Sequence, residues 1–127
     1  MSTILDLQPA SVWHYFHQLT QIPRPSHHEE AVQQYVLDEA ARLGLPAERD
    51  AVGNIRVRKP ASAGHEGALG VILQGHLDMV PQKNADKVHD FTRDPITTQV
   101  HADGRLSADG TTLGADNGIG VALILAV

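Results

Sequence analysis

The spacing of apolar positions changes several times along the chain, and each change predicts a different element. In "PASVWHYFHQLTQI", residues 9–22, the apolar residues Val12, Phe16 and Leu19 recur at helical spacing. The two prolines of "IPRPS" impose extended backbone, so this helix should end before them. The pattern therefore predicts a short amphipathic helix near the N-terminus.

A second helix is predicted over residues 27–43. Ser26 and Glu29 have the spacing of a capping box, in which each side chain bonds to the backbone of the other. Apolar residues recur at helical spacing from Val32 onward, and Gly44 is typical of the position that follows a helix. Start, body and stop signals thus agree on one helix.

Two hairpins are predicted from alternating polar and apolar residues around turn-forming pairs. "PAERDAVGNIRVRK" alternates on either side of Gly53-Asn54, and "ITTQVHADGRLSA" alternates on either side of Asp103-Gly104. Both segments therefore predict a pair of antiparallel strands with one face exposed.

Two continuous apolar runs predict buried elements. "VILQ", residues 71–74, is typical of a central strand that is covered on both faces. "IGVALILAV", residues 119–127, predicts the start of a wholly buried helix. The order of elements predicts one layered α/β domain over residues 1–127.

Composition narrows the class of protein. The 127 residues are 42% hydrophobic and 20% charged, with a formal charge of -5 and scattered basic residues, which argues against a nucleic-acid partner. No apolar run approaches the roughly 20 residues of a membrane span, and no signal pattern is recognisable, so a cytoplasmic protein is expected. Because the chain has no cysteine, any metal must be held by His, Asp and Glu.

Candidate chemistry lies directly after the predicted central strand. In an α/β sheet, ligands bind at the carboxyl ends of the strands, and His76 and Asp78 follow residues 71–74 there. If the strand continues, its period of two places both side chains on one side. The imidazole could then bind a metal while the carboxylate fixes its tautomer. An H-x-D tripeptide is common, however, and by itself is weak support for a metal site.

Asp116 in "LGADNGIG" is a second candidate, with two interpretations. It precedes a predicted helix among glycines that permit close backbone approach, which suits a metal-binding carboxylate. Asp116 or Asn117 could equally cap that helix, which is the commoner role of such residues. The segment lacks the Lys and Ser/Thr of a phosphate loop. Of the other histidines, those at 14 and 17 are expected on a helix surface, those at 27 and 28 lie in a first helical turn, which disfavours a cation, and those at 65, 89 and 101 match no ligand spacing.

Several long segments resemble a known family. "LQGHLDMVPQKN", "VHDFTRDPI" and "GTTLGADNGIG", in that order and together with "IPRPSHHEE" and "ERDAVGNIRVRKPA", resemble the N-terminal part of the aminoacyl-histidine (Xaa-His) dipeptidases, which are co-catalytic zinc peptidases. The resemblance implies the α/β core of a zinc-peptidase catalytic domain with two Zn²⁺ ions. It implies that His76 binds one zinc and that Asp116 bridges both. It also implies that Asp78 is the aspartate that orients the centre, and that the Asp116-Asn117 peptide bond is cis.

The implied reaction is hydrolysis of unblocked dipeptides, with C-terminal histidine favoured, by a water molecule activated between two zincs in a cytoplasmic homodimer. In this family the general-base glutamate, the remaining ligands and the lid or dimerisation domain follow the "ADNG" segment. Residues 1–127 are therefore expected to be a truncated catalytic domain that is inactive alone. Two alternatives stay open: a non-catalytic binding or assembly module of the same lineage, and a tripeptidase or deacylase specificity on the same fold.

Overall fold

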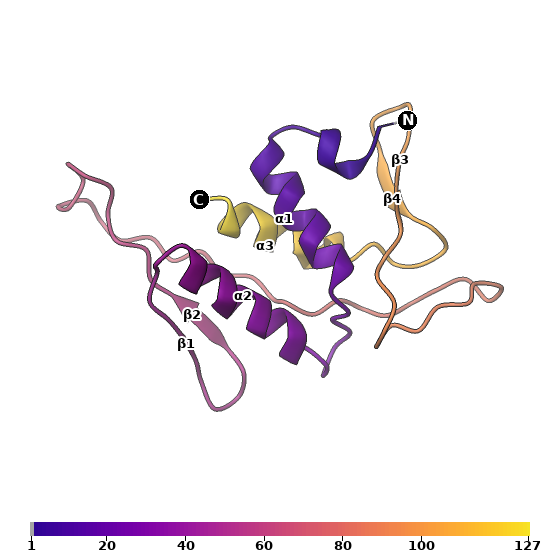
Figure 1. Cartoon of the computed structure of the whole chain (residues 1–127), viewed down its shortest axis with the longest axis horizontal. Helices are drawn as coiled ribbons and strands as arrows, with labels where there is room; N and C mark the ends of the chain where they lie inside the picture. The colour runs from indigo at the N-terminus through magenta and orange to yellow at the C-terminus, as the bar shows by residue number, and fades with distance from the viewer. Residues whose placement is uncertain (1) are drawn as a thin grey trace.

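The computed structural model describes residues 2–127 and combines helices with two short hairpins (Figure 1). Helix α1 passes across α3, and α2 lies beside the first hairpin. In chain order the elements are η1 (Ile4–Asp6), α1 (Ala10–Gln21), α2 (Glu30–Arg42), β1 (Ala47–Arg49), β2 (Ile55–Val57), β3 (Thr98–Val100), β4 (Leu106–Ala108) and α3 (Ala115–Leu125).

The core lies where α1 meets α3, with one side of α2 joining it. The helical spacing at the N-terminus predicted α1 correctly, since Phe16 and Leu19 are each only 1% exposed. Val32 of α2 and Ala122 of α3 are fully buried in the same cluster. Burying an apolar side chain of the size of Phe or Leu stabilises a fold by about 1.5–3 kcal/mol, so this cluster contributes most of the packing.

Helix α2 is confirmed, but its predicted capping box is wrong. The helix begins at Glu30 instead of residue 27, and no side chain caps it. Ser26 Oγ donates to Asp78 Oδ2 at 2.5 Å, and Glu29 Oε1 accepts from the His27 backbone N–H at 3.0 Å. Ser26 is therefore used in a contact between distant segments, which the local spacing did not reveal. At the other end Gly44 adopts φ +70°, as expected after a helix.

Both predicted hairpins are present. β1 pairs with β2, so that Glu48 lies opposite Arg56, and these two side chains form an exposed ion pair. β3 pairs with β4 around a turn in which Gly104 has φ +86°. Turn-forming pairs flanked by alternating residues were therefore a sufficient signal for antiparallel strands.

The predicted central strand over residues 71–74 is wrong for this structure. The segment is extended but pairs with no described strand, and Val71 and Ile72 are 80% and 93% exposed. A central strand needs a neighbouring strand on each side to bond its backbone and cover its side chains. Within residues 2–127 the two sheets are the separate hairpins, so neither neighbour is present.

Helix α3 is confirmed, although it is not wholly buried. Val121 and Ala122 face the core, whereas Leu123 is 53% exposed. One face of the helix packs on α1, and the chain at Gly75 lies close to Val121 and Ile124, so the exposure is confined to part of the helix. In the described part of the chain, no helix has the length and apolar character that crossing a bilayer requires.

Candidate metal centre

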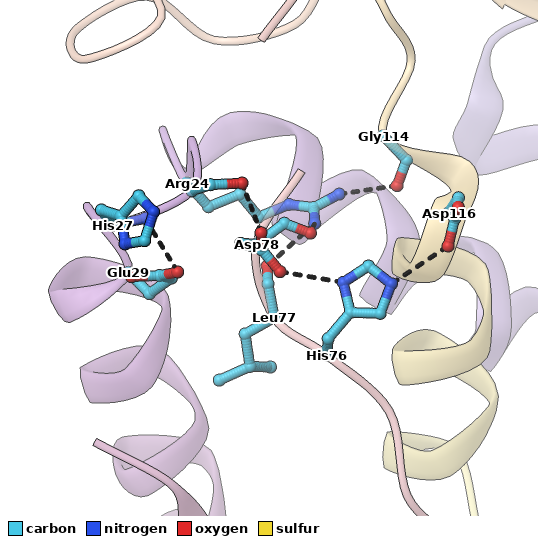
Figure 2. A network of polar contacts seen from close by, with 9 residues as sticks. Arg24, His27, Glu29, His76, Leu77, Asp78, Gly114 and Asp116 are labelled. Atoms are coloured by element: carbon cyan, nitrogen blue, oxygen red, sulfur yellow. Dashed lines mark hydrogen bonds and ion pairs between the residues drawn. The ribbon is translucent and has the colours of Figure 1, made fainter. Parts of the chain in front are cut away.

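The imidazole of His76 lies between two carboxylates that come from opposite directions (Figure 2). Its Nδ1 is 2.9 Å from Asp78 Oδ1, and its Nε2 is 3.0 Å from Asp116 Oδ1. The side chains of His76 and Asp78 lie on the same side of the chain, as a strand period of two predicted, although no strand is formed there. Asp116 is 40 residues further along the chain than His76. The structure therefore brings the three predicted site residues together.

Asp78 is held in a fixed orientation. One of its oxygens faces His76, and the other accepts the 2.5 Å hydrogen bond from Ser26 Oγ. The Ser26 hydrogen bond lowers the pKa of the Asp78 carboxyl, with help from His76 and against the opposing effect of burial. An ionised, oriented carboxylate on Nδ1 is the usual partner of a histidine that binds a metal through Nε2.

Short backbone ladders bring the two parts of the site together. Met79 forms a parallel bridge with Pro25, and its N–H donates to the Arg24 carbonyl at 2.9 Å. Lys83 forms an antiparallel bridge with Thr111. The first bridge fixes the segment of His76 and Asp78 against the chain that follows α1. The second aligns the following residues with the loop that leads to Asp116.

At the start of α3, the side chain of Asp116 contacts His76 and does not cap the helix. Gly114 precedes the helix with φ +76°, a conformation that favours glycine, and Asp116 and Asn117 have non-helical dihedrals. Gly114 occupies the N-cap position, and neither the Asp116 nor the Asn117 side chain hydrogen-bonds to the backbone of a described residue of the helix, so the N-cap interpretation is wrong. The Asp116–Asn117 peptide bond is cis, as the family resemblance implies.

The site is open to solvent on the Asp116 side. The side chains of His76 and Asp116 are 52% and 97% exposed, while that of Asp78 is 29% exposed. The hydrogen bond to Asp116 raises the pKa of His76, and Asp78 adds to this against the effect of burial. Asp116 Oδ2 makes no hydrogen bond with any described residue, so this oxygen is available for a further ligand.

The donor set fits part of a zinc site. Imidazole nitrogen and carboxylate oxygen are ordinary zinc ligands, and His76 Nε2 and Asp116 Oδ1 are close enough to share one ion. A protein zinc site uses three or four protein ligands. Among residues 2–127, no three His, Cys, Asp or Glu side chains group so as to hold a metal, so the remaining histidines add no ligand here.

Sequence reasoning missed two residues of the site: Ser26, which it assigned to a capping box, and Arg24. The side chain of Arg24 is 1% exposed and hydrogen-bonds to the carbonyls of Leu77, Asp78 and Gly114 around the candidate ligands. The available signal was an arginine between the two prolines of "IPRPS", where the backbone is extended. Nothing local in that pattern indicates burial.

The fold is that of solved peptidases. A tripeptidase from Staphylococcus aureus matches 91% of this chain and 30% of its own with a TM-score of 0.68, and at 20% identity that match concerns the fold alone. No protein-family model matches the chain.

Two further proteins share much more of the sequence. The crystal structure of an aminoacylhistidine dipeptidase from Vibrio alginolyticus matches 98% of this chain with a TM-score of 0.95 and 50% identity. The cytosol non-specific dipeptidase of Escherichia coli (strain K12) is 55% identical over 128 residues, which cover all of this chain. The match spans 25% and 26% of these two proteins. The predicted resemblance to one portion of an aminoacyl-histidine dipeptidase, and its α/β fold, are thereby confirmed.

Proposed function

We propose that the intact protein hydrolyses unblocked dipeptides, with C-terminal histidine favoured, at a two-zinc centre to which this chain contributes His76, Asp78 and Asp116. The observation that carries the proposal is the 3.0 Å approach of His76 Nε2 to Asp116 Oδ1 from segments 40 residues apart. Asp78 on the other ring nitrogen supports the same interpretation, because a metal-binding imidazole needs its second N–H fixed.

The two similar dipeptidases support the substrate class. One is named for aminoacylhistidine substrates and the other as non-specific, and both act on dipeptides by name. The chain spans about a quarter of each. We therefore assign the general base and the other ligands to polypeptide outside these residues, and expect the 127-residue chain alone to be inactive. The word "cytosol" in one name supports a cytoplasmic location.

Each of the three side chains has a distinct task. His76 and Asp116 would hold zinc, which supplies polarisation of the scissile carbonyl and activation of water when bound. Asp78 Oδ1 would accept a hydrogen bond from the Nδ1–H of His76 and so keep the ring oriented towards Asp116. Asp116, with one oxygen on His76 and the other free, has the donors required to bridge two ions.

The test is dipeptide hydrolysis by the intact protein with and without His76. Wild-type protein should hydrolyse a dipeptide with C-terminal histidine faster than one with C-terminal leucine, and N-acetylation of either should block the reaction. His76→Ala should lower kcat/KM by more than the roughly 10–100-fold typical of residues that only orient a ligand, and should lower zinc content with it.

His65→Ala is the matched control, because His65 is exposed and its side chain forms no hydrogen bond or ion pair with any described residue. It should leave rate and zinc content unchanged. Retention of both in His76→Ala would refute the ligand assignment. Cleavage of a tripeptide in preference to every dipeptide would instead replace the proposed substrate class.

A further inference from the structure

Arg24 is a buried cation without a carboxylate partner. Its side chain is 1% exposed, and no ion pair to it is formed by any residue of 2–127. Burial lowers the pKa of its guanidinium to about 10, while the nearby charge of Asp78 opposes that shift. The group therefore stays protonated at neutral pH. Removing such a charge from water costs several kcal/mol unless its hydrogen bonds are satisfied.

Backbone carbonyls satisfy the guanidinium, and they come from three segments of the chain. Nη1 donates to the carbonyls of Leu77 and Asp78 at 2.9 and 3.2 Å, and Nη2 donates to the carbonyl of Gly114 at 2.8 Å. Nε donates more weakly, at 3.4 Å, to the carbonyl of Leu19 near the end of α1. Figure 2 shows the side chain reaching between the segment of Asp78 and Gly114.

Those carbonyls adjoin the two candidate ligands. Leu77 directly follows His76, and Gly114 lies two residues before Asp116. The donors of a guanidinium diverge in a fixed planar fork, so the distance between their acceptors is fixed as well. Arg24 thus connects the backbone beside His76 with the backbone beside Asp116.

Two glycines leave the space that this arrangement needs. A Cβ atom on Gly114 would lie 2.6 Å from Arg24 Nη2 and 2.9 Å from Met79 Sδ. A Cβ atom on Gly118 would also lie 2.6 Å from Nη2, and 3.0 Å from Phe16 Cε2. The start of α3 can therefore approach the guanidinium only because both positions lack a side chain.

We infer that Arg24 is a positioning residue of the metal centre, whose buried guanidinium sets the separation of His76 and Asp116 by bridging their backbone segments. The inference deepens the proposed function and rests on it for the identity of the site. Arg24 itself contacts neither candidate ligand side chain among the described hydrogen bonds.

The experiment compares Arg24→Lys with wild type in the intact protein, using Zn²⁺ affinity by chelator competition and the visible spectrum of the Co²⁺-loaded site. A lysine keeps the charge but places its three donors on one nitrogen, so it lacks the two separate nitrogens with which Arg24 reaches Leu77 and Asp78 on one side and Gly114 on the other. Zinc affinity should fall about 10–100-fold, and the Co²⁺ bands should shift, because the ligand geometry is relaxed. Arg58→Lys, at an exposed arginine, is the matched control and should change neither.

Gly118→Ala provides a second variant in case Arg24→Lys does not fold. It keeps Arg24 but adds a Cβ atom 2.6 Å from its Nη2, which must displace the guanidinium. Gly118→Ala should therefore also weaken Zn²⁺ binding and alter the Co²⁺ spectrum. A folded Arg24→Lys or Gly118→Ala protein with wild-type affinity and spectrum would overturn the inference. Wild-type protein that binds Zn²⁺ but cleaves no dipeptide would overturn the proposed reaction alone, whereas wild type that binds no metal would overturn both.

Discussion

The three α-helices and the segment 58–74 both contain large apolar residues, yet only the helices bury theirs in the core. Leu19 of α1 is 1% exposed, whereas Leu69 is 95% exposed and every residue of 58–74 is exposed. In Figure 1 this segment runs out beyond α2 and returns, away from the contact between α1 and α3. Hydrophobicity alone therefore did not decide which stretch became core.

The difference lies in the backbone. A helix bonds its own N–H and C=O groups and needs only one partner for its apolar face, which α1 and α3 provide for each other. A central strand needs partners on both edges as well as cover on both faces. Residues 71–74 make no backbone hydrogen bond with any residue of 2–127, so the run stays extended and exposed.

The largest expected effect compares one substitution at the two leucines. In the 127-residue chain, Leu19→Ala should lower the free energy of unfolding by about 2–5 kcal/mol, because it leaves a cavity in the core. Leu69→Ala should change it by less than about 0.5 kcal/mol, because solvent already surrounds that side chain. Urea unfolding monitored by circular dichroism measures both.

Equal costs for the two variants would mean that segment 58–74 is packed and that the contrast between the regions is false. The same pair in the intact protein sharpens the comparison. If further polypeptide covers segment 58–74, Leu69→Ala should cost more there than in the 127-residue chain, while Leu19→Ala should cost the same.

Elements with a local cause were predictable from the sequence. The apolar spacing of α1 and the turn at Asp103-Gly104 act within a few residues, and both appear where expected. The strand over residues 71–74 failed because strand formation depends on distant partners. The capping box failed for a related reason, since Ser26 has a competing acceptor in Asp78, 52 residues away.

The candidate site was predictable to a similar extent. His76 and Asp78 are two residues apart, so their contact followed from local periodicity. The approach of Asp116 was implied by the family resemblance and not by spacing, because Asp116 lies 40 positions after His76, beyond the hairpin of β3 and β4. Arg24 was not predictable, since its burial results from the packing of three segments around one side chain.

A smaller effect on the free energy of unfolding is expected from replacing a glycine by alanine in the packed helices and in the exposed segment 58–74. Gly118→Ala places a Cβ atom 2.6 Å from Arg24 Nη2 and 3.0 Å from Phe16 Cε2 in the packed helices. Overpacking of this kind costs about 1–3 kcal/mol, which exceeds the gain of up to about 1 kcal/mol in helix propensity. We expect a net loss of about 1–2 kcal/mol in urea unfolding.

Gly70→Ala is the control in the exposed segment, where a Cβ atom would meet no atom within 4 Å. Its free energy of unfolding should match wild type or rise slightly, since alanine reduces the freedom of the unfolded chain. A destabilised Gly70→Ala protein would show that segment 58–74 is packed. An unaffected Gly118→Ala protein would show that α3 is not tightly packed at Gly118.

The smallest expected effect is on the pH dependence of the free energy of unfolding, and it compares substitutions of Glu39 and Glu66. Glu39 Oε1 accepts hydrogen bonds from Tyr15 of α1 at 2.7 Å and from Arg42 at 2.5 Å. Arg42, and then Tyr15, lower the pKa of Glu39 to about 2 from 4.5, against the effect of burial. A depressed pKa in the folded state stabilises the fold above about pH 4.5, and this contribution is lost as the pH falls towards about 2.

Glu39→Gln should therefore lower the free energy of unfolding by about 1 kcal/mol at pH 7, and its difference from wild type should shrink in urea titrations towards pH 3. Glu66 in the exposed segment also has a lowered pKa, but its partners are its own backbone N–H and that of Gly64. An unfolded chain can form the same local contacts, so Glu66→Gln should leave the pH dependence of stability unchanged. A pH-independent difference for Glu39→Gln would mean that the link between α1 and α2 does not depend on the charge of Glu39.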